Sequence, residues 1–212
     1  RCVFRRVGNH CMYLDTVDGG LIERNTFTQW AFGRLAIRLN GTEALRPTGA
    51  ILTQNVVIKD NLIIGWIDPV SEPSGPHNGG GDSYNMTGVQ LGSSTGSQIR
   101  VINGVSVNVG LQQIGPNVSC IRNTIVNCTN GIKLDSCEDV LVAGNRIIGA
   151  ADDGDPGWGI VIGTNAANFG LRPCRGVWLF DNEVRNREPL KLWPYIGPEW
   201  NGLSEHDVRV TE

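Results

Sequence analysis

One short pattern occurs twice in succession between residues 117 and 150, and it limits the possible folds of the chain more than any other feature. Each copy has two apolar residues one position apart, then an asparagine three positions later and another apolar residue two positions further on. The copies are Val118, Cys120, Asn123 and Ile125, and then Val140, Val142, Asn145 and Ile147. The two asparagines are 22 residues apart. This offset matches one turn of a solenoid rather than a globular supersecondary unit.

The same pattern recurs along most of the chain. Its asparagines predict a ladder of Asn25, Asn61, Asn103, Asn123, Asn145 and Asn182. The copy near Asn103 is imperfect because Ile99 and Val101 lie one residue late, so we expect a slip in the turn there. We expect each asparagine to adopt the left-handed conformation and to bond neighbouring backbone in a tight bend.

A third short strand precedes each copy, at residues 12–14, 37–39, 89–91, 132–134 and 160–162. Three alternating strands per repeat bury every second side chain in a central core. We therefore predict an all-β, right-handed parallel β-helix, a solenoid of about seven coils with extruded loops. The predicted core columns are Phe27, Ile63, Ile125, Ile147 and Val184, and Ile22, Ile58, Cys120, Val142 and Leu179.

Composition agrees with a folded chain of this class. Among 212 residues, 18% are charged and 40% are hydrophobic, which excludes a disordered or membrane-spanning protein. The net charge of -3 gives no reason to expect nucleic acid as a partner. Neither end of the sequence looks like a solenoid cap. We interpret residues 1–212 as a single β-helix segment that is part of a longer chain.

The repeated asparagine bends resemble the pectate-lyase-like right-handed parallel β-helix family, the pectin-lyase-like superfamily, in which such ladders occur between two sheets. The resemblance covers nearly the whole chain and implies a fold more than an activity. The pattern V-x-V-x-x-N-x-I also fits a leucine-rich repeat, which would make the chain a binding module. Leucine does not dominate here, however, and two further β-like segments occupy each repeat.

The outward positions of the third strand form the most polar face that we predict. They carry Tyr13, Asp15, Arg38, Asn40, Gln90, Lys133 and Asp135. Polysaccharide lyases, glycosidases and phage tailspikes of this fold use such a sheet and its loops as a groove for sugar chains. The resemblance therefore implies that all of these residues except Asp15 bind substrate. His77, from the loop at residues 65–88, is expected to bind substrate with them. With three coils between them, Arg38 and Lys133 would be roughly 14 Å apart.

The catalytic candidates on this face are Lys133, Asp135, Arg38 and Asp15. Hydrolysis needs two carboxyl groups about 5 to 9.5 Å apart, and Asp15 and Asp135 are separated by several coils. A lyase would need a cation and a base, for which Lys133, Arg38, Tyr13 and His77 are available. Lyase, hydrolase and binding without cleavage all stay open.

An acidic loop and two cysteines provide further candidates. The acidic loop contains Asp152, Asp153 and Asp155. It could be a solvated turn, supply one partner of a carboxyl pair, or bind calcium. We expect no cofactor other than calcium. Cys137 and Cys174 each lie eight residues before a ladder asparagine, so we expect them to be neighbours in adjacent coils. Their spacing of about 4.8 Å suits a disulfide or two stacked thiols.

The outward positions of the Val-x-Val strand form an apolar column, which we predict to be Leu21, Val57, Ile121, Leu141 and Trp178. Such a column should be covered either by loops of the same chain or by other subunits, as in a homotrimer. The function that we predict is binding, with cleavage left open, of an extracellular or cell-surface polysaccharide by a tailspike-like protein, extracellular or virion-associated. The alternative is a non-catalytic shaft or adhesin.

Overall fold

The computed structural model describes most of the chain, in a series of ranges. These are residues 1–30, 35–41, 53–65, 87–92, 97–102, 105–110, 114–128, 130–135, 137–149, 158–163, 174–185, 188–192, 196–197, 200–201 and 208–211. Strands and turns account for all the secondary structure of these residues. They contain no helix long and apolar enough to cross a membrane.

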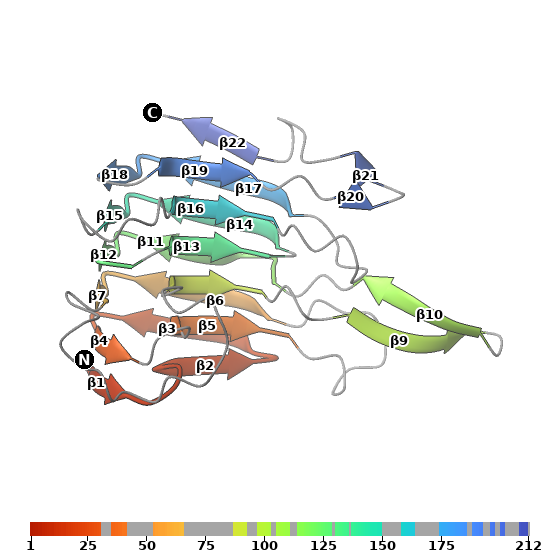
Figure 1. The fold of residues 1–212 in the computed structure, drawn as a ribbon, viewed down its shortest axis with the longest axis horizontal. Helices are drawn as coiled ribbons and strands as arrows, with labels where there is room; N and C mark the ends of the chain where they lie inside the picture. Colours follow the sequence, from red (N-terminus) through yellow and green to blue (C-terminus); the bar gives the residue numbers. More distant parts are fainter. Residues whose placement is uncertain are drawn as a thin grey trace, which may run out of the picture.

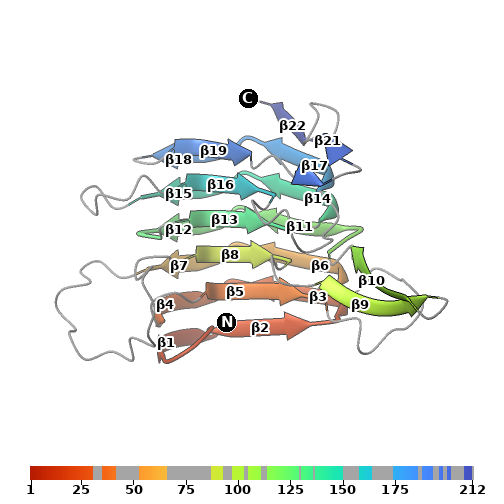
Figure 2. The same cartoon turned by 45° about the vertical axis from the view of Figure 1, so that its right-hand side comes forward.

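Three parallel sheets form the walls of the molecule (Figures 1 and 2). Sheet A contains β1 (Val3–Val7), β4 (Thr26–Trp30), β7 (Leu62–Ile64), β12 (Thr124–Val126), β15 (Arg146–Ile148) and β18 (Glu183–Arg185). Sheet B contains β2 (Met12–Asp15), β5 (Leu35–Asn40), β8 (Thr87–Leu91), β13 (Asn130–Leu134), β16 (Trp158–Ile162) and β19 (Glu188–Leu192). Sheet C contains β3 (Asp18–Glu23), β6 (Gln54–Lys59), β11 (Val118–Ile121), β14 (Glu138–Ala143), β17 (Arg175–Phe180) and β22 (Val208–Thr211).

The chain visits sheets B, C and A in turn and then starts the next coil. Five coils have all three strands within the described residues, beginning at β2, β5, β8, β13 and β16. In Figure 1 they stack one above the other, with the N-terminus at one end of the stack and the C-terminus at the other. This arrangement is a right-handed parallel β-helix, and it confirms the fold predicted from the repeat.

The core consists of the columns predicted from the sequence. On sheet C, Ile22 pairs with Ile58, Ile58 with Cys120, Cys120 with Val142 and Val142 with Leu179. On sheet A the column is Phe27, Ile63, Ile125, Ile147 and Val184. Most of these side chains are completely buried, because each strand turns every second residue inward.

The asparagine ladder runs from Asn25 through Asn61, Asn123 and Asn145 to Asn182. At each step the side-chain amide and the backbone N–H of one asparagine both donate to the Oδ1 atom of the next, at 2.9 to 3.2 Å. The amides of the last four also donate to carbonyl oxygens of the preceding coil, as Asn123 Nδ2 does to Ile58 O at 3.0 Å. The ladder thus satisfies polar groups at a bend that is largely closed to water.

The left-handed residue of this bend lies one position before the predicted one. The ladder asparagines have ordinary backbone angles, whereas the residue before each has a φ between 50° and 60°. These residues are Arg24, Asp60, Arg122, Gly144 and Asp181. Our expectation for the asparagine backbone was therefore wrong. The asparagine is needed for its amide, while the preceding residue absorbs the strained turn.

The prediction that Asn103 is part of the ladder is also wrong. Asn103 lies outside the described residues, but Asn61 bonds directly to Asn123, and β7 pairs directly with β12. The segments on either side of residue 103 are β9 (Ser97–Ile102) and β10 (Val105–Gly110), which pair antiparallel with each other. Figure 1 shows this hairpin projecting from the side of the stack. Local alternation identified two strands but could not tell whether they pair with the coils or with each other.

A second small antiparallel pair, β20 (Ile196–Gly197) and β21 (Trp200–Asn201), lies near the last coils. The leucine-rich-repeat alternative is excluded, because such a repeat has one parallel sheet and this chain has three.

Removing a central ladder residue should destabilise the whole stack. In Asn123→Ala, the N–H groups of Asn61 and the carbonyl of Ile58 lose buried partners, and we expect the free energy of unfolding to fall by about 2–4 kcal/mol. Asn25→Ala at the end of the ladder, where the side chain is only half-buried, should cost about 1 kcal/mol. Urea unfolding followed by circular dichroism measures both, and equal losses would contradict this account of the ladder.

Candidate functional site

A row of polar side chains lies on the outer surface of sheet B. Tyr13 pairs with Arg38, Arg38 with Gln90, and Gln90 with Lys133. Their apolar strand neighbours point into the core, so alternation alone directs these four outward. Figure 2 shows the strands that carry them, β2, β5, β8 and β13, stacked in this order. At β16 the row becomes apolar, because Lys133 pairs with the buried Val161.

Arg38 and Lys133 lie closer together than predicted. Only Gln90 lies between them in this row, because β9 and β10 pair with each other and do not form a coil of the stack. Two strand spacings place their backbones about 10 Å apart, instead of the 14 Å expected for three coils.

Tyr13 is the exposed aromatic side chain at one end of the row. The residue is 45% exposed, and the guanidinium carbon of Arg38 lies 5.2 Å from the ring centroid. The amide of Asn40 donates a hydrogen bond to the Tyr13 hydroxyl at 2.8 Å, and the His10 ring lies 5.8 Å away. These contacts fix the ring and hold a cation against it.

Asp135 lies at the other end and is fully buried. Gln90 Nε2 donates to its Oδ2 atom at 2.9 Å, and Lys133 Nζ lies 3.6 Å from the same oxygen. Among the described residues its Oδ1 atom has no hydrogen-bond partner. Burial raises the pKa of Asp135, and the charge of Lys133 and the bond from Gln90 oppose this shift only in part.

Gly92 lies between Asn40 and Asp135 in the next column of sheet B. Its φ is +87°, and a Cβ atom there would lie 1.8 Å from the backbone oxygen of Asp135. Only glycine fits both the conformation and this close approach. Asn40 and Asp135 therefore flank a position that has no side chain. Like Asp135 Oδ1, Asn40 Oδ1 is buried and has no hydrogen-bond partner among the residues that the structure describes.

The described carboxyl groups of this face do not form a catalytic pair. Asp15 and Asp135 are three strands apart on sheet B, about 14 Å, which exceeds the separation used in sugar hydrolysis. The other predicted participants, His77 and the acidic residues Asp152, Asp153 and Asp155, lie outside the described residues. In the described part of the chain, no three His, Cys, Asp or Glu side chains form a group that could hold a metal ion.

The outer surface of sheet C carries exposed apolar side chains. The column is Leu21, Val57, Ser119, Leu141 and Trp178. Ser119 thus takes the position predicted for Ile121, which pairs instead with Lys59, one column further on. That prediction was wrong by two residues. Leu21, Leu141 and Trp178 are between 38% and 57% exposed, so the described residues leave this face largely uncovered.

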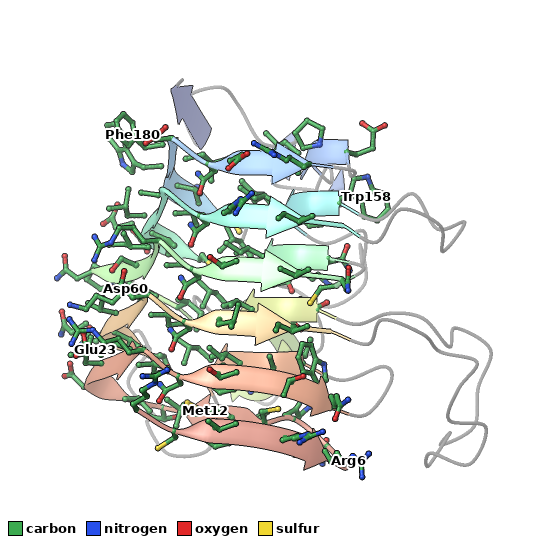
Figure 3. All side chains as sticks on the ribbon, turned by 90° about the vertical axis from the view of Figure 1, so that its left-hand side faces the viewer. Arg6, Met12, Glu23, Asp60, Trp158 and Phe180 are labelled. Carbon is green, nitrogen blue, oxygen red and sulfur yellow. The ribbon has the colours of Figure 1, made fainter. Side chains whose placement is uncertain are left out.

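Phe180 extends the same face, although it was not among the outward residues predicted from the sequence. It lies two residues after Trp178 on β17, is 52% exposed, and is seen at the edge of the molecule in Figure 3, on the side that also carries Glu23 and Asp60. Strand alternation should have identified it, because residues two apart point the same way. The contact of Gln90 with Asp135 had no such signal, since it joins different columns of neighbouring strands.

The cysteines predicted to be neighbours do lie in adjacent coils. Cys137 and Cys174 precede β14 and β17 and are fully buried, and both are free thiols in this structure.

Comparison with known families agrees with this geometry. The model of the right-handed beta helix region matches residues 1–184, so the chain belongs to the right-handed β-helix family. Searches of curated proteins and of solved structures found no match.

Replacing Asp135 should change how stability depends on pH. Because the pKa of Asp135 is raised in the folded state, the contribution of this residue to stability is greatest below the unfolded pKa of about 4 and falls as pH rises towards the folded value. Asp135→Asn cannot ionise, so its free energy of unfolding relative to wild type should increase over this range. Chemical unfolding at a series of pH values measures the difference.

Asp60 provides a control of opposite sign. The hydrogen bonds and charge of Arg122 lower the pKa of Asp60, so the stabilisation from this pair is lost as pH falls. Asp60→Asn should therefore differ from wild type most at neutral pH. Parallel pH profiles for the two variants would contradict the assignment of Asp135.

Proposed function

We propose that the protein binds an extended acidic polysaccharide along the outer surface of sheet B, outside the cell or on a virion. The observation that carries the proposal is the in-register row of Tyr13, Arg38, Gln90 and Lys133, with one polar side chain per coil. A repeated ligand suits a repeated surface, because each coil presents its contact in the same orientation.

The chemistry of the row favours a negatively charged sugar. Arg38 and Lys133 are both half-buried cations, about two strand spacings apart, so they would contact separate units of one chain. A planar guanidinium matches the geometry of a carboxylate or a sulfate. The exposed Tyr13 ring offers an apolar surface for a sugar face. Gln90 is buried and acts by holding Asp135 rather than by touching the ligand.

Cleavage is a further part of this proposal for the assay to test. The catalytic candidates extend over four strands of sheet B, and this spread fits a binding surface better than a single reaction centre. These candidates are Lys133, Asp135, Arg38 and Asp15. A lyase could place its base at His77, and calcium could bind at Asp152, Asp153 and Asp155. The alternative function, a rigid shaft or adhesin, predicts no sugar binding by sheet B.

Glycan binding tests the proposal directly. We expect immobilised uronate-containing or sulfated polysaccharides to bind the protein, and neutral ones to bind weakly. Arg38→Ala and Tyr13→Ala should each weaken binding about tenfold or more, equivalent to about 1.4 kcal/mol. Release of unsaturated products or reducing ends, with and without a calcium chelator, tests cleavage in the same samples.

A matched control separates the face from general charge. Arg146 lies on sheet A and is half-exposed beside Glu183, so Arg146→Ala removes the same charge from a different face. Equal losses for Arg38→Ala and Arg146→Ala would show that net charge alone drives binding. No binding to any polysaccharide in the panel would exclude the proposal and favour the shaft.

We also propose that copies of this chain associate through sheet C, as a homotrimer. Leu21, Leu141, Trp178 and Phe180 form one exposed apolar face. Glu23 and Lys59, which lie two residues after Leu21 and Val57 on this sheet, pair with each other at 3.1 Å. Around a threefold axis this face of each copy would be buried against the other two copies, and an uncovered patch of this kind is typical of an interface.

The assembly state tests this second proposal. Sedimentation velocity should give a trimer for wild type and a smaller species for Trp178→Ala. Tyr13→Ala removes an exposed aromatic side chain from sheet B, the proposed sugar-binding face. This variant should keep the trimer but lose sugar binding. A monomeric wild type, or a trimer unaffected by Trp178→Ala, would contradict association through sheet C.

A further inference from the structure

Cys137 and Cys174 occupy equivalent positions in neighbouring coils. Each immediately precedes a strand of sheet C, and the residues that follow them, Glu138 and Arg175, are paired across β14 and β17. The backbone N–H of Arg175 donates to the carbonyl oxygen of Cys137 at 2.8 Å. The two cysteines are therefore direct neighbours in adjacent coils.

Both thiols are enclosed in the core. Each side chain is completely buried, and Cys137 Sγ lies 3.4 Å from the carbonyl oxygens of Leu91 and Asp135. Cys174 Sγ lies 3.5 Å from the carbonyl oxygen of Leu134. Burial, together with the neighbouring Cys174 thiol, raises the pKa of Cys137. In the folded protein the Cys137 thiol is thus uncharged, and burial protects both thiols from reagents.

We propose that Cys137 and Cys174 form a disulfide between adjacent coils when the chain folds in the presence of a small-molecule disulfide. The spacing of paired parallel strands, about 4.8 Å, lies within the Cα separation that a disulfide accepts. The bond joins the coil that begins at β13 to the coil that begins at β16.

The exchange is balanced in two steps. One cysteine loses its proton, and its thiolate attacks a sulfur of the small disulfide and releases one small thiolate. The second cysteine, also deprotonated, then attacks the protein sulfur of the mixed disulfide and releases the other. The two cysteines are oxidised, the small disulfide is reduced to two thiols, and the two protons pass to solvent or to the leaving thiolates. Because both side chains are buried, the reaction occurs before the coil closes or during its transient opening.

Cys120, which is also buried, does not stack on another cysteine. Cys120 pairs with Ile58 on one side and Val142 on the other. By contrast, Cys137 and Cys174 precede paired residues of neighbouring strands.

Refolding with and without oxidant tests the proposal. The full chain, with the accessible Cys2 and Cys11 replaced by serine, is refolded in oxidised and reduced glutathione or in dithiothreitol. We expect the glutathione sample to lose two hydrogen atoms in mass and to give a linked peptide containing Cys137 and Cys174. Its melting temperature should exceed that of the reduced sample by about 5 to 10 °C, because the link constrains the unfolded chain.

Two variants make the result specific. Cys174→Ala should abolish both the linked peptide and the difference in melting temperature between oxidised and reduced samples. Cys120→Ala, which removes an equally buried thiol, should keep both. The proposal is overturned if refolding with glutathione gives no linked peptide, if it links other cysteines, or if Cys174→Ala keeps the oxidant-dependent stabilisation.

Discussion

In-register stacking of parallel strands is the constraint on which the rest of the structure depends. Each strand of a coil pairs with its equivalent in the next, so one residue type can repeat along the molecule at a fixed spacing. The asparagine ladder uses this repetition to satisfy buried polar groups at the bend between sheets C and A. The core columns use it to bury Ile, Val and Leu side chains above one another. A substitution in one coil therefore also affects its two neighbours.

The same repetition produces two different outer faces. On sheet B the outward position is polar in four successive coils, from Tyr13 to Lys133, and this row is the basis for proposing a polysaccharide ligand. On sheet C the outward positions are mostly apolar, from Leu21 to Trp178, which favours contact with other copies of the chain. One coil pattern can thus provide both a surface for a repeating polymer and a surface for other copies of the chain. This is possible because the outward side chains can vary without changing the residues of the core.

Buried residues of the polar face depend on contacts between neighbouring coils. Asp135 is held by Gln90 from the neighbouring coil and by Lys133 from its own strand, and its burial favours the neutral acid. Loss of its negative charge leaves Lys133 less neutralised, so the positive character of the face should increase as pH falls. Cys137 and Cys174 likewise depend on their neighbours, since only stacking brings the two thiols together.

The sequence by itself determined the fold class, the core columns and five of the six predicted ladder residues, because alternation and a recurrent asparagine are local signals that repeat once per coil. It also placed Tyr13, Arg38, Gln90 and Lys133 on one face. Only the tertiary structure showed that β9 and β10 leave the stack as an antiparallel pair, which removed Asn103 from the ladder and brought Arg38 closer to Lys133. It also decided that Ser119 rather than Ile121 lies in the column of Val57 and Leu141, that Arg122 rather than Asn123 takes the left-handed turn, and that Gln90 reaches Asp135. These features depend on which strands pair and on contacts between columns, and a local pattern carries no information on either.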